Sequence, residues 1–142
     1  MANDVIFPVK LSLRLDWSEM DMFGHINNVM YFKFIQASRV NYWENVKLMR
    51  DYKEQKIGPM LLSTSCHFKK PLFYPGNITL QARVEFIKNS SMGLHHQIIN
   101  DKQELAAEAR DIIVLYNFAE NQTVVIPDDL RKNIEEIEGK KI

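Results

Sequence analysis

The stretch DMFGHINNVMYF, from Asp21 to Phe32, combines residue types that can do chemistry. It begins with a lone carboxylate, Asp21, and reaches Gly24 and His25 within four residues, and two asparagines follow before the chain becomes apolar. A hydrophobic core does not require this order of residues. The stretch therefore raises the hypothesis of a catalytic loop, against the plainer interpretation that Asp21 is a solvated turn residue.

A long helix is predicted to follow this loop, from Asn28 to about Met49, with Asn27 as its N-cap. Its first half, VMYFKFIQA, is apolar nearly all the way round, which a surface helix does not tolerate. The helix should therefore be wrapped by other elements. It becomes more polar after Arg39, and RDYKEQKIGP is predicted to be a connecting loop.

Most of the remaining chain alternates between apolar and polar residues, with the period of two that is typical of half-buried strands. The turns YPGN and NDKQ separate neighbouring runs. The predicted strands span residues 9–17, 62–68, 78–86, 92–98 and 104–118. The alternation of the last strand shifts near Arg110 to Ile112, which predicts a β-bulge there.

This order of elements predicts an α+β fold in which an antiparallel sheet curls around one long central helix. We expect a single domain over residues 1–142, with its core at about 9–118. Helical spacing of apolar residues after Pro127 adds a short C-terminal helix at about 127–138. The open edges and outer faces of such a sheet would accept a second subunit, so we expect a homodimer or homotetramer.

The composition excludes several classes of protein. Lys plus Arg (18) balances Asp plus Glu (18), so no general attraction to nucleic acid or to an anionic membrane is expected. The one cysteine, Cys66, rules out an intrachain disulfide and fits a reducing compartment. We recognise neither a secretory signal in MANDVIFPVK nor an apolar run long enough for membrane insertion, so the expected location is cytoplasmic.

These residues, in this order of elements, resemble the hotdog fold and its 4-hydroxybenzoyl-CoA thioesterase-like family of acyl-CoA thioesterases. The similarity covers roughly Val9 to Phe118. Its most specific part is DMFGHINNVMYFKFIQASRVNYW, which matches a family pattern of Asp, a short gap, Gly-His-Val/Ile-Asn-Asn, Tyr and later Ala-x-Arg. FKKPLFYPGNITLQARV and LAAEARDIIVLYN are weaker matches. The resemblance implies that an acyl thioester lies between two subunits, beside the N-terminus of the central helix.

By this resemblance, Asp21 takes the position of the family's catalytic aspartate and the amide of Asn28 takes the carbonyl-polarising position. Thioester hydrolysis needs an activated water or a carboxylate nucleophile, and it needs an oxyanion stabiliser. Asp21 supplies the carboxylate, and the helix terminus supplies N–H groups and a partial positive charge. Gly24 allows the loop backbone to approach a ligand. The sequence leaves open whether Asp21 is a base or a nucleophile.

The neighbouring residues have two interpretations each. His25 either orients Asp21 or a water, or braces the loop. Related acyl-carrier-protein thioesterases have an Asn where Phe23 stands here, so a full three-residue catalytic set does not transfer. Asn27 and Asn28 are also ordinary helix caps, which is compatible with an oxyanion site. The other two family positions, Tyr31 and Arg39, are expected to contribute packing and ion pairing.

Other polar residues are less informative. Lys69 and Lys70 form either a solvated strand end or a contact for the phosphates of coenzyme A. Cys66 falls on the apolar face of its strand, opposite His67, and is expected in the core. The adjacent histidines 95 and 96 would likewise point to opposite faces and cannot share a metal. We therefore predict no metal and no cofactor, coenzyme A being part of the substrate.

The sequence contains no G-x-S-x-G elbow, Walker loop or dinucleotide fingerprint, which argues against serine hydrolase, nucleotide and nicotinamide chemistry. The favoured function is acyl-CoA thioesterase, which hydrolyses an acyl-CoA to a carboxylic acid and free coenzyme A. Two alternatives stay open. One is an acyl-carrier-protein thioesterase, and the other is a non-catalytic acyl-CoA-binding protein on the same scaffold.

Overall fold

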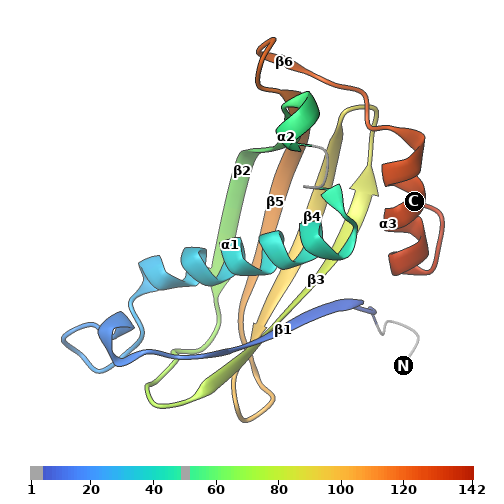
Figure 1. Ribbon diagram of the computed structural model, residues 1–142. Helices are drawn as coiled ribbons and strands as arrows, with labels where there is room; N and C mark the ends of the chain where they lie inside the picture. The colour runs from blue at the N-terminus through green and yellow to red at the C-terminus, as the bar shows by residue number, and fades with distance from the viewer. Residues whose placement is uncertain (1–4, 49–51) are drawn as a thin grey trace.

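A six-stranded antiparallel sheet forms the main layer of the protein, whose computed structural model describes residues 5–48 and 52–142 (Figure 1). The strands lie in the order β1-β3-β4-β5-β2, and the short β6 pairs with β5. Their bounds are Val9–Arg14 (β1), Ile57–Phe68 (β2), Asn77–Ile87 (β3), Ser91–Ile99 (β4), Leu105–Asn117 (β5) and Gln122–Thr123 (β6). The predicted antiparallel sheet is thus confirmed, and β1 and β2 are its edges.

Helix α1, Asn28–Asn45, crosses one face of the sheet (Figure 1). Asn27 caps it as predicted, because its side-chain oxygen accepts a hydrogen bond from the N–H of Val29 at 3.1 Å. The helix ends four residues before the predicted Met49, which lies outside the described residues. The chain leaves the helical conformation at Val46, and Lys47 has a positive φ of 62°.

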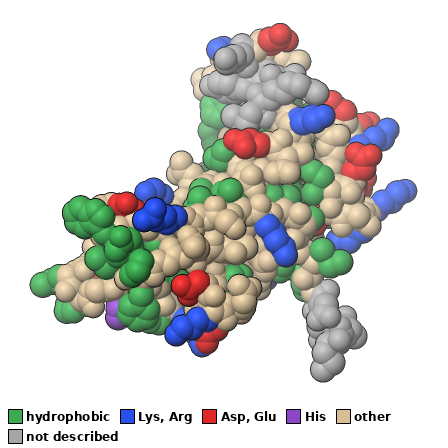
Figure 2. All heavy atoms as spheres, turned by 60° about the horizontal axis from the view of Figure 1, so that its bottom comes forward, with side chains coloured by type: hydrophobic (Ala, Val, Ile, Leu, Met, Phe, Trp, Pro, Cys, Tyr) green, Lys and Arg blue, Asp and Glu red, His purple; other side chains and the backbone are tan. Residues whose placement is uncertain are grey.

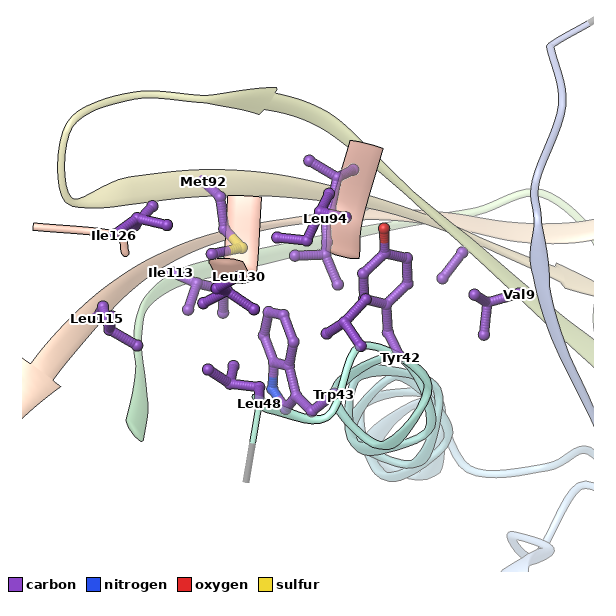
Figure 3. Close-up of a cluster of buried hydrophobic side chains, with 14 residues drawn as sticks. Val9, Tyr42, Trp43, Leu48, Met92, Leu94, Ile113, Leu115, Ile126 and Leu130 are labelled. Carbon is purple, nitrogen blue, oxygen red and sulfur yellow. The ribbon is translucent and has the colours of Figure 1, made fainter. Parts of the chain in front are cut away.

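Two clusters of buried side chains lie between the helices and the sheet. One contains Leu15, Ile26, Tyr31 and Ile35 and lies under the first half of α1. The other lies under its second half and includes the side chains labelled in Figure 3, among them Tyr42, Trp43 and Leu130. Leu130 belongs to α3, Asp128–Glu138. Because α3 contributes to the core beside α1, the picture of a sheet around one long central helix is not confirmed in that form.

The first edge strand is shorter than its alternation suggests. β1 ends at Arg14, and Trp17, expected at the end of this strand, begins the 3-10 helix η1, Trp17–Glu19. Asp16 starts this helix with a capping box, in which its side chain accepts from the N–H of Ser18 and its own N–H donates to Glu19. The loop that precedes α1 therefore starts with a helical turn.

The second edge strand is longer than predicted. β2 begins at Ile57 and not at Leu62, because the Ile57 end pairs with the distant residue Asn117 of β5. Pro59 is tolerated there because one side of an edge strand needs no N–H donor. The predicted connecting loop also contains a short helix α2, Tyr52–Gln55, while residues 50–51 of that loop lie outside the described residues.

The predicted bulge at Arg110 to Ile112 is wrong. The register between β2 and β5 shifts on the β2 side, between Leu61 and Ser63. β5 keeps its alternation through this region, and Asp111 therefore points into the core with a side chain that is 0% exposed. The apparent shift in alternation arises because Asp111 has polar partners on the inner face, and β5 itself has no bulge there.

Candidate active site

The loop between η1 and α1 folds into a tight turn that presents Asp21. The N–H of Asp21 donates to the carbonyl of His25 at 2.7 Å, and the N–H of Gly24 donates back to the carbonyl of Asp21 at 3.2 Å. Gly24 has a φ of 84°, a conformation that side chains disfavour, so a glycine is required at this point of the turn. The turn places Asp21 and His25 directly before the helix.

The carboxylate of Asp21 is held by one oxygen and open at the other. Oδ1 accepts hydrogen bonds from the backbone N–H groups of Phe23 (2.8 Å) and His25 (3.1 Å). Oδ2 accepts none from the residues that the structure describes. This arrangement fixes the rotamer of Asp21 while leaving one anionic oxygen free for a water or a carbonyl carbon.

The N-terminus of α1 opens beside this carboxylate. Asn28 is the first helical residue, and its N–H donates to no acceptor in the described part of the chain, as expected for a helix terminus. Asp21 and Asn28 line one open pocket of about 380 Å³, together with His25, Ile26, Tyr31, Phe68, Lys69, Lys70 and Pro71. One pocket is therefore lined both by a residue with a free carboxylate oxygen and by a residue with a free N–H at a helix N-terminus.

His25 contacts Asp21 through its backbone. The N–H of His25 donates to Oδ1, while the imidazole packs edge-on against Phe73 with ring centroids 4.9 Å apart. No described hydrogen bond joins the imidazole to the carboxylate. The geometry thus favours loop bracing over the predicted orientation of Asp21 by the ring.

Tyr31 ties the far wall of the pocket to α1. Its hydroxyl accepts from the N–H of Leu72 (3.2 Å) and donates to the carbonyl of Lys70 (3.4 Å), and its ring packs edge-on against Phe68. Burial raises the pKa of Tyr31, so the hydroxyl stays protonated. The loop that follows β2 is therefore fastened to the first turn of the helix, in line with the packing role predicted for Tyr31.

The two candidate phosphate contacts differ. Lys70 Nζ pairs with Glu104 Oε2 at 2.5 Å, which turns it toward the β4–β5 hairpin, and this contact lowers the pKa of Glu104. Lys69 makes no ion pair within the described ranges, and it lines the pocket with Asp21. The adjacent pair therefore offers one uncommitted cation at the pocket.

A buried polar network, which the sequence pattern did not reveal, lies under the middle of α1. Asp111 Oδ2 accepts from His96 Nε2 (2.7 Å) and from Arg39 Nε (2.9 Å), and His96 Nδ1 is hydrogen-bonded to the hydroxyl of Ser38 at 2.8 Å. Burial alone would raise the pKa of Asp111, but these hydrogen bonds lower it to about 2. The available signal was a carboxylate at an inward position of the β5 alternation.

The remaining polar candidates lie apart from the pocket chemistry. Cys66 is half-buried on the inner face, and burial raises the pKa of its thiol to about 11, which makes it unreactive. His95 and His96 point to opposite faces, and His95 is bonded to Glu108 and Arg83. Within residues 5–48 and 52–142, no group of three His, Cys, Asp or Glu side chains could hold a metal.

No described helix combines the length and the apolar character needed to span a membrane. Hydrophobic side chains do gather on the surface at the end of the molecule that holds the Asp21 loop (Figure 2). Trp17, Met22, Phe23 and Phe73 are each more than half exposed. The end of the molecule that carries the Asp21 loop thus has an exposed apolar surface.

Comparison with known families adds an independent finding. Residues 15–134 match the model of the thioesterase-like superfamily. The match includes the whole Asp21 loop, α1 and the strands from β2 to β5, so the residues that line the pocket fall within it.

Individual relatives agree with this match. The chain is 28% identical over 87 residues to the uncharacterised protein YsmA of Bacillus subtilis (strain 168), covering 61% of this chain and 56% of YsmA. It is 19% identical to the long-chain acyl-CoA thioesterase FadM of Escherichia coli (strain K12), over 83% of this chain and 90% of FadM. A thioesterase from Thermus thermophilus, crystallised with coenzyme A and Zn, shares the fold, with a TM-score of 0.84, 18% identity and coverage of 96% and 98%.

Proposed function

Because this chain belongs to the thioesterase-like superfamily, whose reaction is thioester hydrolysis, we propose that it hydrolyses an acyl-CoA to a carboxylic acid and free coenzyme A. One observation supports this most strongly: Asp21, which has a free carboxylate oxygen, and Asn28, which has a free N–H, line the same pocket. Hydrolysis of a thioester needs these two functions together, an activator of the attacking group and a donor for the oxyanion.

The proposed oxyanion donor is the N–H of Asn28. As the thioester carbonyl becomes tetrahedral, its oxygen acquires negative charge, which this N–H and the helix dipole stabilise. Asn27 keeps the terminus well formed, because it caps the helix through Val29 and leaves Asn28 free. Collapse of the tetrahedral intermediate releases coenzyme A as a thiolate, which takes up a proton.

Asp21 has two roles open to it, and both use Oδ2. As a general base it removes a proton from a water that attacks the carbonyl carbon. As a nucleophile it attacks the carbon itself and forms a mixed anhydride, which water then cleaves to regenerate the carboxylate. In either case Gly24 and the N–H groups of Phe23 and His25 hold the carboxylate in place. His25 serves as a brace for this loop.

Coenzyme A is the proposed carrier of the acyl group. FadM, a relative along most of its length, acts on long-chain acyl-CoA, and the thioesterase from Thermus thermophilus was crystallised with coenzyme A. In this chain Lys69 is the cation available for a phosphate, whereas Lys70 is engaged by Glu104. The proposed reaction uses no metal and no other cofactor, and the proposed setting is the cytoplasm.

A second copy of the chain is proposed to close the site. The pocket is open, and β2 is an edge strand of 12 residues on which Leu61, Leu62 and Phe68 are exposed. An unpaired apolar edge favours association. We therefore expect a homodimer or homotetramer, and light scattering that shows only monomer at micromolar concentration would contradict this.

Thiol release from a panel of acyl-CoA esters tests the function. A free-thiol reagent should detect turnover of at least one aliphatic or aromatic acyl-CoA. Faster cleavage of the same acyl group from acyl carrier protein than from coenzyme A would favour an acyl-carrier-protein thioesterase. Tight binding of acyl-CoA without thiol release would favour a non-catalytic acyl-CoA-binding protein.

Asn28→Pro tests the oxyanion role. Proline lacks the N–H but is well accepted at the first position of a helix. The preceding residue, Asn27, already has φ −60° and ψ 135°, the conformation that proline requires before it. The variant should therefore fold and lose about a hundredfold in kcat. An unchanged kcat would remove Asn28 from the mechanism.

A further inference from the structure

The network of Ser38, Arg39, His96 and Asp111 joins α1 to two strands of the sheet. His96 belongs to β4 and Asp111 to β5, while Ser38 and Arg39 are neighbours in α1. Ser38 and His96 are 2% and 1% exposed, and the side chain of Asp111 is 0% exposed. All three contacts are shorter than 3 Å, so the side chains have little freedom to slide.

Stability alone does not account for this network. Asp111 Oδ1 is buried and has no hydrogen-bond partner among the described residues, which costs free energy. Apolar residues of similar volume often replace buried ion pairs without loss of stability. A buried network that keeps an unpaired oxygen therefore calls for a role beyond holding the fold together.

The described polar contacts of the first half of α1 reach loop segments and η1 but no strand of the sheet: Tyr31 is hydrogen-bonded to Lys70 and Leu72, and Lys33 pairs with Glu19. The contacts of this half with the sheet itself are mostly apolar. Tyr31, Phe34 and Ile35 are buried, and apolar side chains such as Val29 and Phe32 lie on its exposed side. Apolar contacts are non-directional, so they fix the position of a helix along its own axis only loosely. Hydrogen bonds to a carboxylate are directional and charge-assisted. The network is therefore well suited to set the axial position of α1.

If α1 shifts along its axis as a rigid helix, Asn28 at its N-terminus shifts by the same distance. Arg39 lies 11 residues after Asn28, which corresponds to about 16 Å along a rigid helix. The Asn28 N–H moves with the helix, whereas Asp21 is attached to the loop. A displacement of about 1 Å at a reacting centre can lower a rate about a hundredfold. The position of α1 thus decides how well the N–H and the carboxylate face the same carbonyl.

We propose that Ser38, Arg39, His96 and Asp111 are positioning residues that fix α1 along its axis and thereby aim the Asn28 N–H at the thioester carbonyl. This inference rests on the proposed function. The N–H is needed most when charge develops on the oxygen, so loss of positioning should lower kcat and leave KM nearly unchanged.

The first test compares three variants by steady-state kinetics well below their melting temperatures. Arg39→Met should lower kcat about tenfold with KM within about twofold, and Ser38→Ala, which removes only the outer hydrogen bond, should lower kcat about threefold. The matched control is Ile134→Val, which loosens apolar packing in α3 without touching the network. It should lose stability and keep its kcat. If folded Arg39→Met and Ser38→Ala both keep the wild-type kcat, the proposal is overturned.

A double-mutant cycle then separates aiming from general destabilisation. Once Asn28→Pro has removed the N–H, misplacing the helix should cost nothing further, so adding Arg39→Met should leave kcat within about twofold of Asn28→Pro alone. If the double variant instead lost kcat by the product of the two single-variant factors, Arg39 would act independently of the N–H and the proposal would be overturned. If Asn28→Pro alone had wild-type kcat, the oxyanion role would fail and this inference with it. Thiol release by the wild-type protein would still support thioesterase activity.

Discussion

Asp21 and Asp111 are two aspartates in opposite surroundings. Asp21 lies on a loop and lines the pocket, with Oδ1 held by two backbone N–H groups and with no described hydrogen bond at Oδ2. Asp111 lies under α1, where one oxygen accepts from both His96 and Arg39. The first carboxylate is fixed but accessible, which reactivity requires. The second is fixed and inaccessible, so it can act only through the residues that it holds.

The first turn and the middle of α1 repeat this difference. The first turn is exposed and leaves the Asn28 N–H free, while Ser38 and Arg39 in the middle of the helix are bound to the sheet. The free N–H at the helix terminus can stabilise an oxyanion only if the rest of the helix holds it in position. The comparison therefore predicts that changes at Asp111 affect stability first and changes at Asp21 affect turnover first.

The largest expected effect is the loss of stability in Asp111→Ala. Removing the carboxylate leaves the Arg39 guanidinium and His96 buried without their partner, which typically costs about 3–5 kcal/mol. Urea unfolding followed by circular dichroism measures this cost. Asp21→Ala loses only loop hydrogen bonds and should cost about 1 kcal/mol. Equal losses in the two variants would contradict the contrast between the sites.

The second largest expected effect is a loss of unfolding free energy in acid, caused by protonation of Asp111. Its pKa is lowered to about 2 in the folded protein, so the stabilisation is present above its unfolded value near 3.8 and is lost as the pH falls through 2. This shift corresponds to about 2 kcal/mol. Asp111→Asn should lack this contribution to the acid-induced fall in unfolding free energy between pH 4 and 2. Parallel curves for wild type and variant would show that Asp111 is not held ionised.

A smaller effect is expected from His25→Ala. The backbone N–H that holds Asp21 remains, and only the packing against Phe73 is lost, so kcat should fall about tenfold or less. Steady-state thiol release measures this change. Loss of activity as complete as that caused by removing the carboxylate would instead give the imidazole an essential acid–base role.

Local features of the site could be predicted from sequence. Asn27 caps α1 because the cap depends on its own neighbours, and Gly24 meets a backbone requirement within its own turn. The strands of the sheet followed from alternation for the same reason. The family resemblance added the expectation of thioester chemistry, which the superfamily match supports.

The features that sequence did not predict depend on distant partners. β2 starts at Ile57 because Asn117 is there to pair with it, and Lys70 forms an ion pair with Glu104. A carboxylate at the inward position of Asp111 interrupts the apolar pattern of the strand. Its partners, Arg39 and His96, are far away in sequence, so the pattern alone does not show that the carboxylate is paired. Pairings of this kind become visible only when the sheet and the helix are assembled.

The most direct test of the account is single-turnover thioester cleavage by Asp21→Asn. The amide keeps an oxygen that can accept from Phe23 and His25, so the turn and the binding of substrate should survive. Asp16→Asn is the matched control, since Asp16 also accepts a loop N–H but lies outside the pocket. We expect the rate to fall about a hundredfold or more in Asp21→Asn and to stay within about twofold of wild type in Asp16→Asn. A near-wild-type rate in folded Asp21→Asn would contradict the mechanism and reduce Asp21 to a turn residue.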